Sequence, residues 1–136
     1  MPGSFFDSNI LLYATSDDVA KADRAEQLIR SGGTISIQVL NEIANVARKK
    51  MRFSWHRTHD LLARFRQLLP IVVPVTLEIH EAGLVLAERY LLSVYDGMIV
   101  AAALSSGCDT LWSEDMQDGL VIDGRLTVAN PFRARM

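Results

Sequence analysis

Residues 34–51 read TISIQVLNEIANVARKKM, and this stretch passes from a strand pattern to a helix pattern without a linker. The run over residues 34–37 is rich in β-branched side chains, which favours a strand. From Val39 to Met51 the apolar side chains recur at the spacing of a helix face, which predicts an amphipathic helix. These side chains are Val39, Leu40, Ile43, Val46 and Ala47. A strand that leads directly into a helix is the repeating unit of parallel α/β sheets.

The rest of the chain repeats this alternation. Further strands are predicted at residues 4–6, 71–75 and 110–113, and further helices at residues 17–29, 54–69, 76–91 and 93–104. Residues 121–128 have the pattern of a hairpin around Asp123-Gly124, a dipeptide suited to a type I′ turn. Alternating strands and helices imply right-handed crossovers. We therefore expect a three-layer α/β/α fold with a mainly parallel central sheet, the hairpin at or beyond one edge, and a single domain over residues 1–136.

The composition fits a small globular protein. The chain has 136 residues, of which 49% are hydrophobic and 22% charged, so it can bury a core. Its one cysteine, Cys108, excludes an internal disulfide and a cysteine-based zinc cage. The longest apolar run, residues 98–104, is far shorter than the roughly 20 residues of a membrane helix, and no signal-peptide pattern is present. We expect a cytoplasmic protein with no membrane partner.

Four acids lie where the predicted strands end and the predicted helices begin. Asp7 ends the first strand, Glu42 lies early in the second helix, Asp96 opens the helix after Ser93, and Asp115 follows the last parallel strand. In a parallel sheet these junctions share one edge, which is where ligands bind. The sequence therefore predicts that the four carboxylates converge.

Each acid also has a purely structural interpretation. Asp7 could cap a turn, and Asp115 could be an ordinary loop residue. Asp96 fits such an interpretation less well, because the residues three, four and seven positions later are apolar and share its helix face. Glu42 borders the apolar stripe of its own helix. Neither Asp96 nor Glu42 has a lysine or arginine placed in the sequence to pair with it.

Carboxylates gathered at one edge repel one another. The repulsion is about 4 kcal/mol per pair at about 4 Å with an effective dielectric constant of about 20, so the group must hold protons or bind a cation. Carboxylate oxygens suit Mg²⁺ or Mn²⁺. Zinc is not favoured, because none of the three histidines lies near the predicted edge.

Four short motifs carry a resemblance to a known family. They are Phe5-Phe6-Asp7-Ser8-Asn9, the Val-Leu-Asn-Glu segment that ends at Glu42, Tyr95-Asp96-Gly97-Met98-Ile99, and Leu111-Trp112-Ser113-Glu114-Asp115. In this order they resemble a PIN domain, most closely that of the VapC-type toxins of bacterial toxin–antitoxin pairs. The resemblance spans nearly the whole chain.

The resemblance implies a metal-dependent endoribonuclease that acts as the toxin of such a pair. Asp7, Glu42, Asp96 and Asp115 match the family's metal-binding acids, while Asn9 and Ser113 match its supporting polar positions. The implied cofactor is Mg²⁺ or Mn²⁺. The implied partners are an RNA substrate, an antitoxin protein and a second copy of the chain in a homodimer.

A basic segment supports a polyanionic partner. Residues 48–66 contain seven Lys and Arg residues and one acid, although the whole chain has a net charge of -2. Charge runs of this kind are usually solvated helix faces. With an RNA substrate implied, we expect the first four basic residues to bind phosphates rather than to take part in chemistry. These are Arg48, Lys49, Lys50 and Arg52, which we call the basic cluster.

Other classes of protein also gather acids at the edge of a parallel sheet. Receiver domains and haloacid-dehalogenase-like phosphatases both need a late lysine, and no lysine follows Lys50 in this chain. The alternative that stays open is a non-catalytic module that binds RNA or an antitoxin and keeps the acids for stability or for a structural metal.

Overall fold

A computed structural model describes residues 3–133, which form a six-stranded sheet flanked by helices. The strand order is β3-β2-β1-β4-β6-β5, and every pairing is parallel except that of β5 with β6. The strands are β1 (Ser4–Phe6), β2 (Thr34–Ser36), β3 (Ile71–Val73), β4 (Thr110–Trp112), β5 (Val121–Ile122) and β6 (Leu126–Ala129). The predicted mainly parallel sheet is confirmed.

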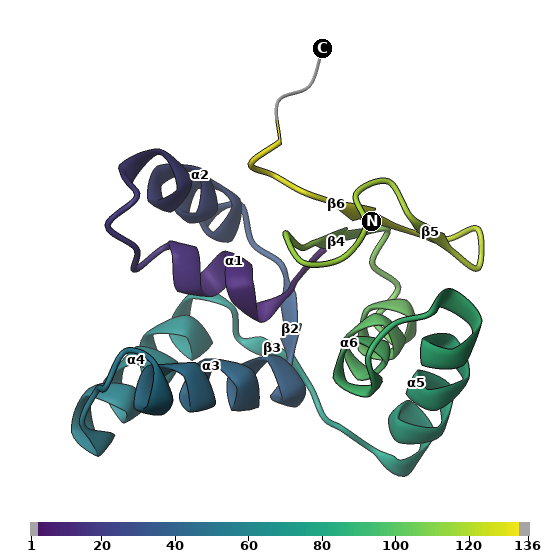
Figure 1. The fold of residues 1–136 in the computed structure, drawn as a ribbon, viewed down its shortest axis with the longest axis horizontal. Coiled ribbons are helices and arrows are strands. Elements are labelled where there is room, and N and C mark those ends of the chain that lie inside the picture. The colour runs from purple at the N-terminus through teal and green to yellow at the C-terminus, as the bar shows by residue number, and fades with distance from the viewer. Residues whose placement is uncertain (1–2, 134–136) are drawn as a thin grey trace.

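Helices cover the sheet on two sides. They are α1 (Ser8–Tyr13), α2 (Val19–Arg30), α3 (Ile37–Lys49), α4 (Trp55–Leu68), α5 (Leu77–Tyr90) and α6 (Val94–Ser105). In Figure 1, α1 to α4 lie on one side of strands β1 to β3, and α5 and α6 lie on the other. This is the predicted α/β/α arrangement. No helix in the described part of the chain is long and apolar enough to cross a membrane.

Three helices have N-caps at the first residues of their predicted ranges, 54, 76 and 93. The hydroxyls of Ser54, Thr76 and Ser93 each accept a hydrogen bond from the backbone N–H three residues later, at the start of α4, α5 and α6. The third of these caps matters for the site, because its donor is the backbone of Asp96.

The structure differs from the sequence prediction at the first junction. The sequence predicts no helix before residue 17, whereas α1 begins at Ser8, one residue after the end of β1. Asp7 is its N-cap, with a side chain that accepts a hydrogen bond from the Ser8 N–H. Six residues give too few turns for a helical repeat to show in the sequence. The early helix matters, because it turns Ser8 and Asn9 back toward Asp7.

The hairpin lies at the sheet edge, as predicted. Asp123 and Gly124 both have positive φ, 51° and 67°, as a type I′ turn requires. The Arg125 N–H donates to the Ile122 carbonyl at 3.0 Å and closes the turn. Strand β5 is therefore the outer strand on this side.

Helices α5 and α6 cross at two glycines. A Cβ at Gly97 would overlap the backbone carbonyl of Gly83, so the two backbones approach too closely for any side chain there. Gly97 directly follows Asp96, and the crossing therefore fixes the start of α6 and the position of that carboxylate.

Candidate active site

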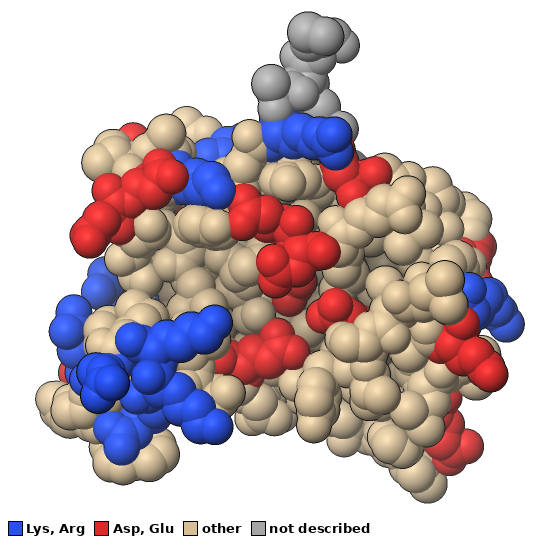
Figure 2. All heavy atoms as spheres, in the orientation of Figure 1, with Lys and Arg blue, Asp and Glu red and all other residues tan. Residues whose placement is uncertain are grey.

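Acidic side chains gather in a hollow in the middle of one face, between α3 and α6 (Figure 2). Strands β1 and β4 are parallel neighbours, with Phe6 opposite Trp112, so Asp7 and the loop that carries Asp115 leave the sheet at the same edge. Glu42 comes from α3 and Asp96 from the first turn of α6. The structure thus brings together the four acids that the sequence singled out.

Asp7 is the buried centre of this group, with 2% of its surface exposed. Its Oδ1 accepts the Ser8 N–H at 2.7 Å. Its Oδ2 accepts the Ser113 hydroxyl at 2.7 Å and the Asn9 amide at 3.1 Å. Three donors from two neighbouring strand ends therefore hold the carboxylate in one orientation.

Ser8 and Asn9 link Asp7 to two of the other acids. The Ser8 hydroxyl donates to Glu42 Oε1 at 2.7 Å. The Asn9 amide nitrogen, which also contacts Asp7, donates to Asp115 Oδ2 at 3.1 Å. Asn9 and Ser113 therefore occupy supporting positions within the hydrogen-bond network of the site.

Asp96 joins the group through charge rather than through a hydrogen bond to another acid. It is half-buried at the start of α6, where its backbone N–H donates to Ser93 Oγ at 3.1 Å. Burial raises the pKa of its carboxyl, and the negative charges of Glu42 and Asp115 raise it further. Asp96 is therefore close enough to both acids to feel their charge.

The carboxyl of Asp7 is the most perturbed of the four. Burial raises the pKa of Asp7 from its ordinary value of 3.8 to about 7, and the charges of Asp96 and Glu42 add to this effect. The hydrogen bond from Ser113 acts in the opposite direction but does not outweigh burial. Ionisation of Asp7 at neutral pH is therefore resisted unless a positive charge enters the site.

The side chains that the structure describes supply no such charge. Within residues 3–133, no lysine, arginine or histidine forms an ion pair with any of the four acids. Mg²⁺ is typically held by one or two carboxylates with water completing its shell. The described residues include no group of three His, Cys, Asp or Glu side chains that could hold a metal ion. The oxygen donors at this edge thus fit a hydrated, oxygen-preferring cation and not a closed protein cage.

A second network beside the acids was not predicted from the sequence. Lys21 Nζ lies 2.7 Å from Glu114 Oε2, and Tyr13 donates its hydroxyl to the other oxygen of that carboxylate. The Glu114 N–H in turn donates to Asn9 Oδ1 at 3.1 Å. Although partial burial raises the pKa of Glu114, the hydrogen bonds from Lys21 and Tyr13 outweigh this and leave it lowered. The network fixes the loop that leads to Asp115.

A hollow of about 350 Å³ opens beside the acids and reaches the end of α3. Asn9 and Asp115 line it at the acidic side, and Met51 lines it at the other. Met51 lies within the basic cluster, and in the described part of the chain no member of this cluster forms an ion pair with any of the four acids. The basic cluster is therefore adjacent to the acids but separate from them, as Figure 2 shows.

Solved structures with the same fold come from several bacteria. One from a Klebsiella pneumoniae toxin–antitoxin complex is 23% identical, with a TM-score of 0.68 over 96% of this chain and 99% of that chain. VapC20 of Mycobacterium tuberculosis, described as a sarcin–ricin loop cleaving toxin, is 21% identical, with a TM-score of 0.64 over 82% and 89%. FitAcB of Neisseria gonorrhoeae is 16% identical, with a TM-score of 0.67 over 96% and 99%. These likenesses establish the shared fold.

The family assignment comes from the sequence itself. No curated protein matches the chain. The pattern of the PIN domain family, however, matches residues 4–117, which include all four acids together with Asn9 and Ser113. The match extends over most of the sheet and every helix, and the chain belongs to the PIN domain family.

Proposed function

We propose that this protein is a Mg²⁺- or Mn²⁺-dependent endoribonuclease and the toxin of a toxin–antitoxin pair. The observation that carries the proposal is the set of four carboxylates around buried Asp7, to which no cationic side chain among residues 3–133 is paired. Such a group is poorly stable by itself and gains most from a bound divalent cation.

Each residue of the site has a proposed role. Asp7 and Asp96 hold the metal directly, and Glu42 and Asp115 hold its water ligands or contribute further oxygens. Asn9 orients the Asp7 and Asp115 carboxylates through its two hydrogen bonds. When bound, the metal lowers the pKa of a water molecule and neutralises charge that develops on the scissile phosphate.

Cleavage of RNA by the purified chain tests this proposal. We expect strand scission with Mg²⁺ or Mn²⁺, and none when EDTA removes the metal. Asp7→Asn and Asp96→Asn should abolish scission, whereas Asp23→Asn on the exposed face of α2 should retain it. Scission that survives EDTA, or that persists in either site variant, would overturn the assignment, and mapped fragments would identify the RNA.

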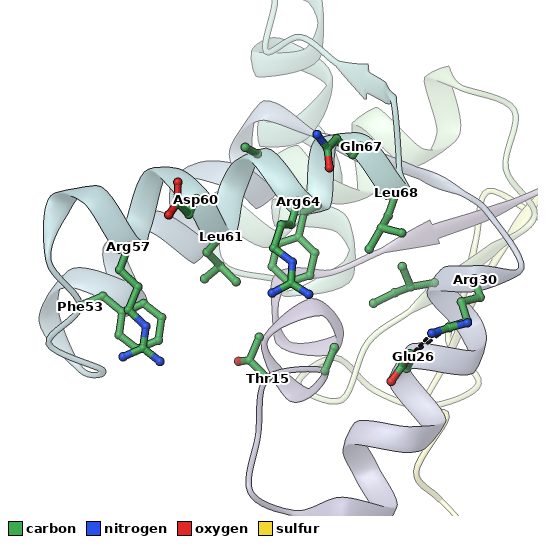
Figure 3. Close-up of a pocket in the computed structure, with 14 residues that line it drawn as sticks. Thr15, Glu26, Arg30, Phe53, Arg57, Asp60, Leu61, Arg64, Gln67 and Leu68 are labelled. Carbon is green, nitrogen blue, oxygen red and sulfur yellow. Dashed lines mark hydrogen bonds and ion pairs between the residues drawn. The ribbon is translucent and has the colours of Figure 1, made fainter.

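The antitoxin has a candidate docking surface in a groove of about 1030 Å³ between α4 and the pair α1 and α2. Figure 3 shows Arg57 and Arg64 pointing from α4 into a groove that mixes apolar and polar side chains. The two acids of the lining already have partners, since Glu26 pairs with Arg30 and Asp60 with His56. Neither arginine forms an ion pair with any residue in the 3–133 range. This lining suits an amphipathic peptide with acidic side chains. Arg64→Glu should then abolish inhibition by a co-expressed antitoxin and leave RNA cleavage intact.

Exposed apolar side chains on α5 support the proposed homodimer. Of the apolar side chains of the α4 region, Leu61, Phe65 and Leu69 complete the core. Helix α5 instead exposes Leu77 and Leu84, which are seven residues apart and thus share one face. Leu84→Glu should convert a dimer to a monomer in light scattering. We place the protein in the cytoplasm, where RNA and an antitoxin would both be available.

A further inference from the structure

We propose that Trp55 and Arg48 form a platform on which an unpaired RNA base stacks, so that the substrate is held as a single strand. The inference rests on the proposed ribonuclease function and specifies the class of RNA that the site accepts. It concerns the surface at the end of α3 and the start of α4, outside the acidic site.

Trp55 is presented to solvent although it is a large aromatic side chain. It is the first residue of α4, directly after the Ser54 cap, and 61% of its surface is exposed. Arg48 lies with its guanidinium carbon 4.2 Å from the centre of the indole ring. Arg48 is itself held by a hydrogen bond of 2.7 Å to the Phe53 carbonyl. The indole is therefore held in place while most of its surface stays open.

The surroundings of Trp55 carry positive charge that no acid neutralises. The basic cluster and Arg57 form no ion pair within the described structure, and the nearby Asp60 pairs with His56 at 3.3 Å. The Arg57 guanidinium lies 3.8 Å from the centre of the Phe53 ring. Figure 3 shows these two side chains one over the other. Cations that surround an exposed aromatic side chain are the combination with which proteins bind single strands, since phosphates meet the charges and bases meet the ring.

The end of α3 brings this surface near the acidic site. The hollow lined by Asn9 and Asp115 is also lined by Met51, which lies between Lys50 and Arg52. Along α3, Arg48 follows Glu42 by six residues, a rise of about 9 Å. A strand whose scissile phosphate is at the acids can therefore reach the platform within a short distance.

Stacking on Trp55 selects against a duplex. In an RNA helix the bases are stacked on one another and paired, so their faces are not available to a protein side chain. A base in a loop or single strand has a free face. A purely electrostatic patch would not make this distinction, because both forms carry phosphates.

Binding assays in EDTA test the platform without interference from cleavage. The probes are a short labelled oligoribonucleotide, its duplex, and a strand of equal length whose central nucleotides are abasic. Wild-type protein should bind the single strand most tightly, and binding should quench tryptophan fluorescence. Trp55→Ala should weaken binding of the single strand by about 5- to 100-fold, the range expected for the loss of one base stack. Trp55→Phe should retain most of the affinity.

A matched control is available on α2. Val19 is the first residue of its helix, as Trp55 is of α4, and is 70% exposed, so Val19→Ala removes an exposed apolar side chain elsewhere. It should leave affinity unchanged. Binding of the abasic strand should be equal for wild type and Trp55→Ala, because no base is present to stack.

Three results would overturn the inference. The first is equal affinity of Trp55→Ala and wild type for the intact strand. The second is equal affinity of wild type for the single strand and the duplex. The third is that Trp55→Ala loses as much affinity for the abasic strand as for the intact strand. Metal-dependent cleavage by wild type together with any of these would leave the proposed ribonuclease function standing. Absence of both binding and cleavage for every RNA would overturn the two proposals together.

Discussion

Replacing Asp7 by asparagine should stabilise the metal-free protein at alkaline pH and not at acid pH. The substitution keeps the shape of the side chain and removes its charge. Asparagine retains one oxygen for the Ser8 N–H, and the Ser113 hydroxyl can accept a hydrogen bond where it now donates one. The Asn9 amide loses its acceptor on this side chain and keeps its hydrogen bond to Asp115. The fold should therefore persist, while the repulsion that involves Glu42 and Asp96 is relieved.

The size of the effect follows from the pKa of Asp7. The folded state holds the pKa at about 7, whereas the unfolded chain has the ordinary value of 3.8. A raised pKa means that the proton favours the folded state, so this stability is fully present below about pH 4 and is lost as the pH rises through about 7. The loss reaches about 4 kcal/mol above that pH. The rearranged hydrogen bonds cost about 1 kcal/mol, so above that pH Asp7→Asn should be more stable to unfolding than wild type by about 3 kcal/mol.

Urea unfolding in EDTA measures this difference. We compare wild type, Asp7→Asn and Asp23→Asn at about pH 4.5 and about pH 8, and follow the tryptophan fluorescence. The free energy of unfolding of Asp7→Asn should exceed that of wild type by about 3 kcal/mol at the higher pH. At the lower pH it should equal that of wild type or fall slightly below it. Asp23→Asn should follow wild type at both. A variant whose difference from wild type does not change with pH would refute the argument from burial.

Four further results are expected. Asp96→Asn should lower the pKa of Asp7, because it removes a neighbouring negative charge. Carboxyl NMR titration measures this pKa, and an unchanged value would show that the two acids are not coupled. Gly97→Ala should destabilise the protein by about 1–3 kcal/mol in thermal unfolding, because the added methyl group meets the backbone of α5; unchanged stability would disprove the close helix crossing. Lys21→Met should raise the pKa of Glu114 in the same titration, and a fixed value would show that the ion pair does not control that carboxyl. Replacing the basic cluster by glutamine should weaken RNA binding and leave the metal dependence of cleavage unchanged. The slope of log affinity against log salt concentration should fall by about one unit per lost phosphate contact, and an unchanged slope would show that the cluster is an ordinary solvated face.

The arrangement of strands, helices and acids could be predicted because its signals are local. Apolar periodicity, the Ser54, Thr76 and Ser93 caps and the Asp123-Gly124 turn each act over a few residues, and each is present in the structure. Parallel topology then places every strand-to-helix junction at one edge. The convergence of the acids follows from this order alone.

The parts that were missed depend on contacts between distant residues. Tyr13 and Glu114 are 101 residues apart, and Lys21 and Glu114 are 93 apart, so no local spacing marks their network. The short helix α1 is held by Asp7 and by packing rather than by its own length. The sequence also does not show which apolar side chains are exposed, because Trp55 and Leu61 lie on one predicted helix and only Leu61 enters the core.

The central claim is that the four acids form a binding site for a divalent cation, and calorimetric titration with Mn²⁺ tests it most directly. Wild type and Asp23→Asn should bind Mn²⁺ and should release protons at about pH 6, where the pKa of Asp7 keeps that carboxyl largely protonated. Asp7→Asn and Asp96→Asn should bind far more weakly and without this proton release. Equal Mn²⁺ affinity in wild type and Asp7→Asn would contradict the claim.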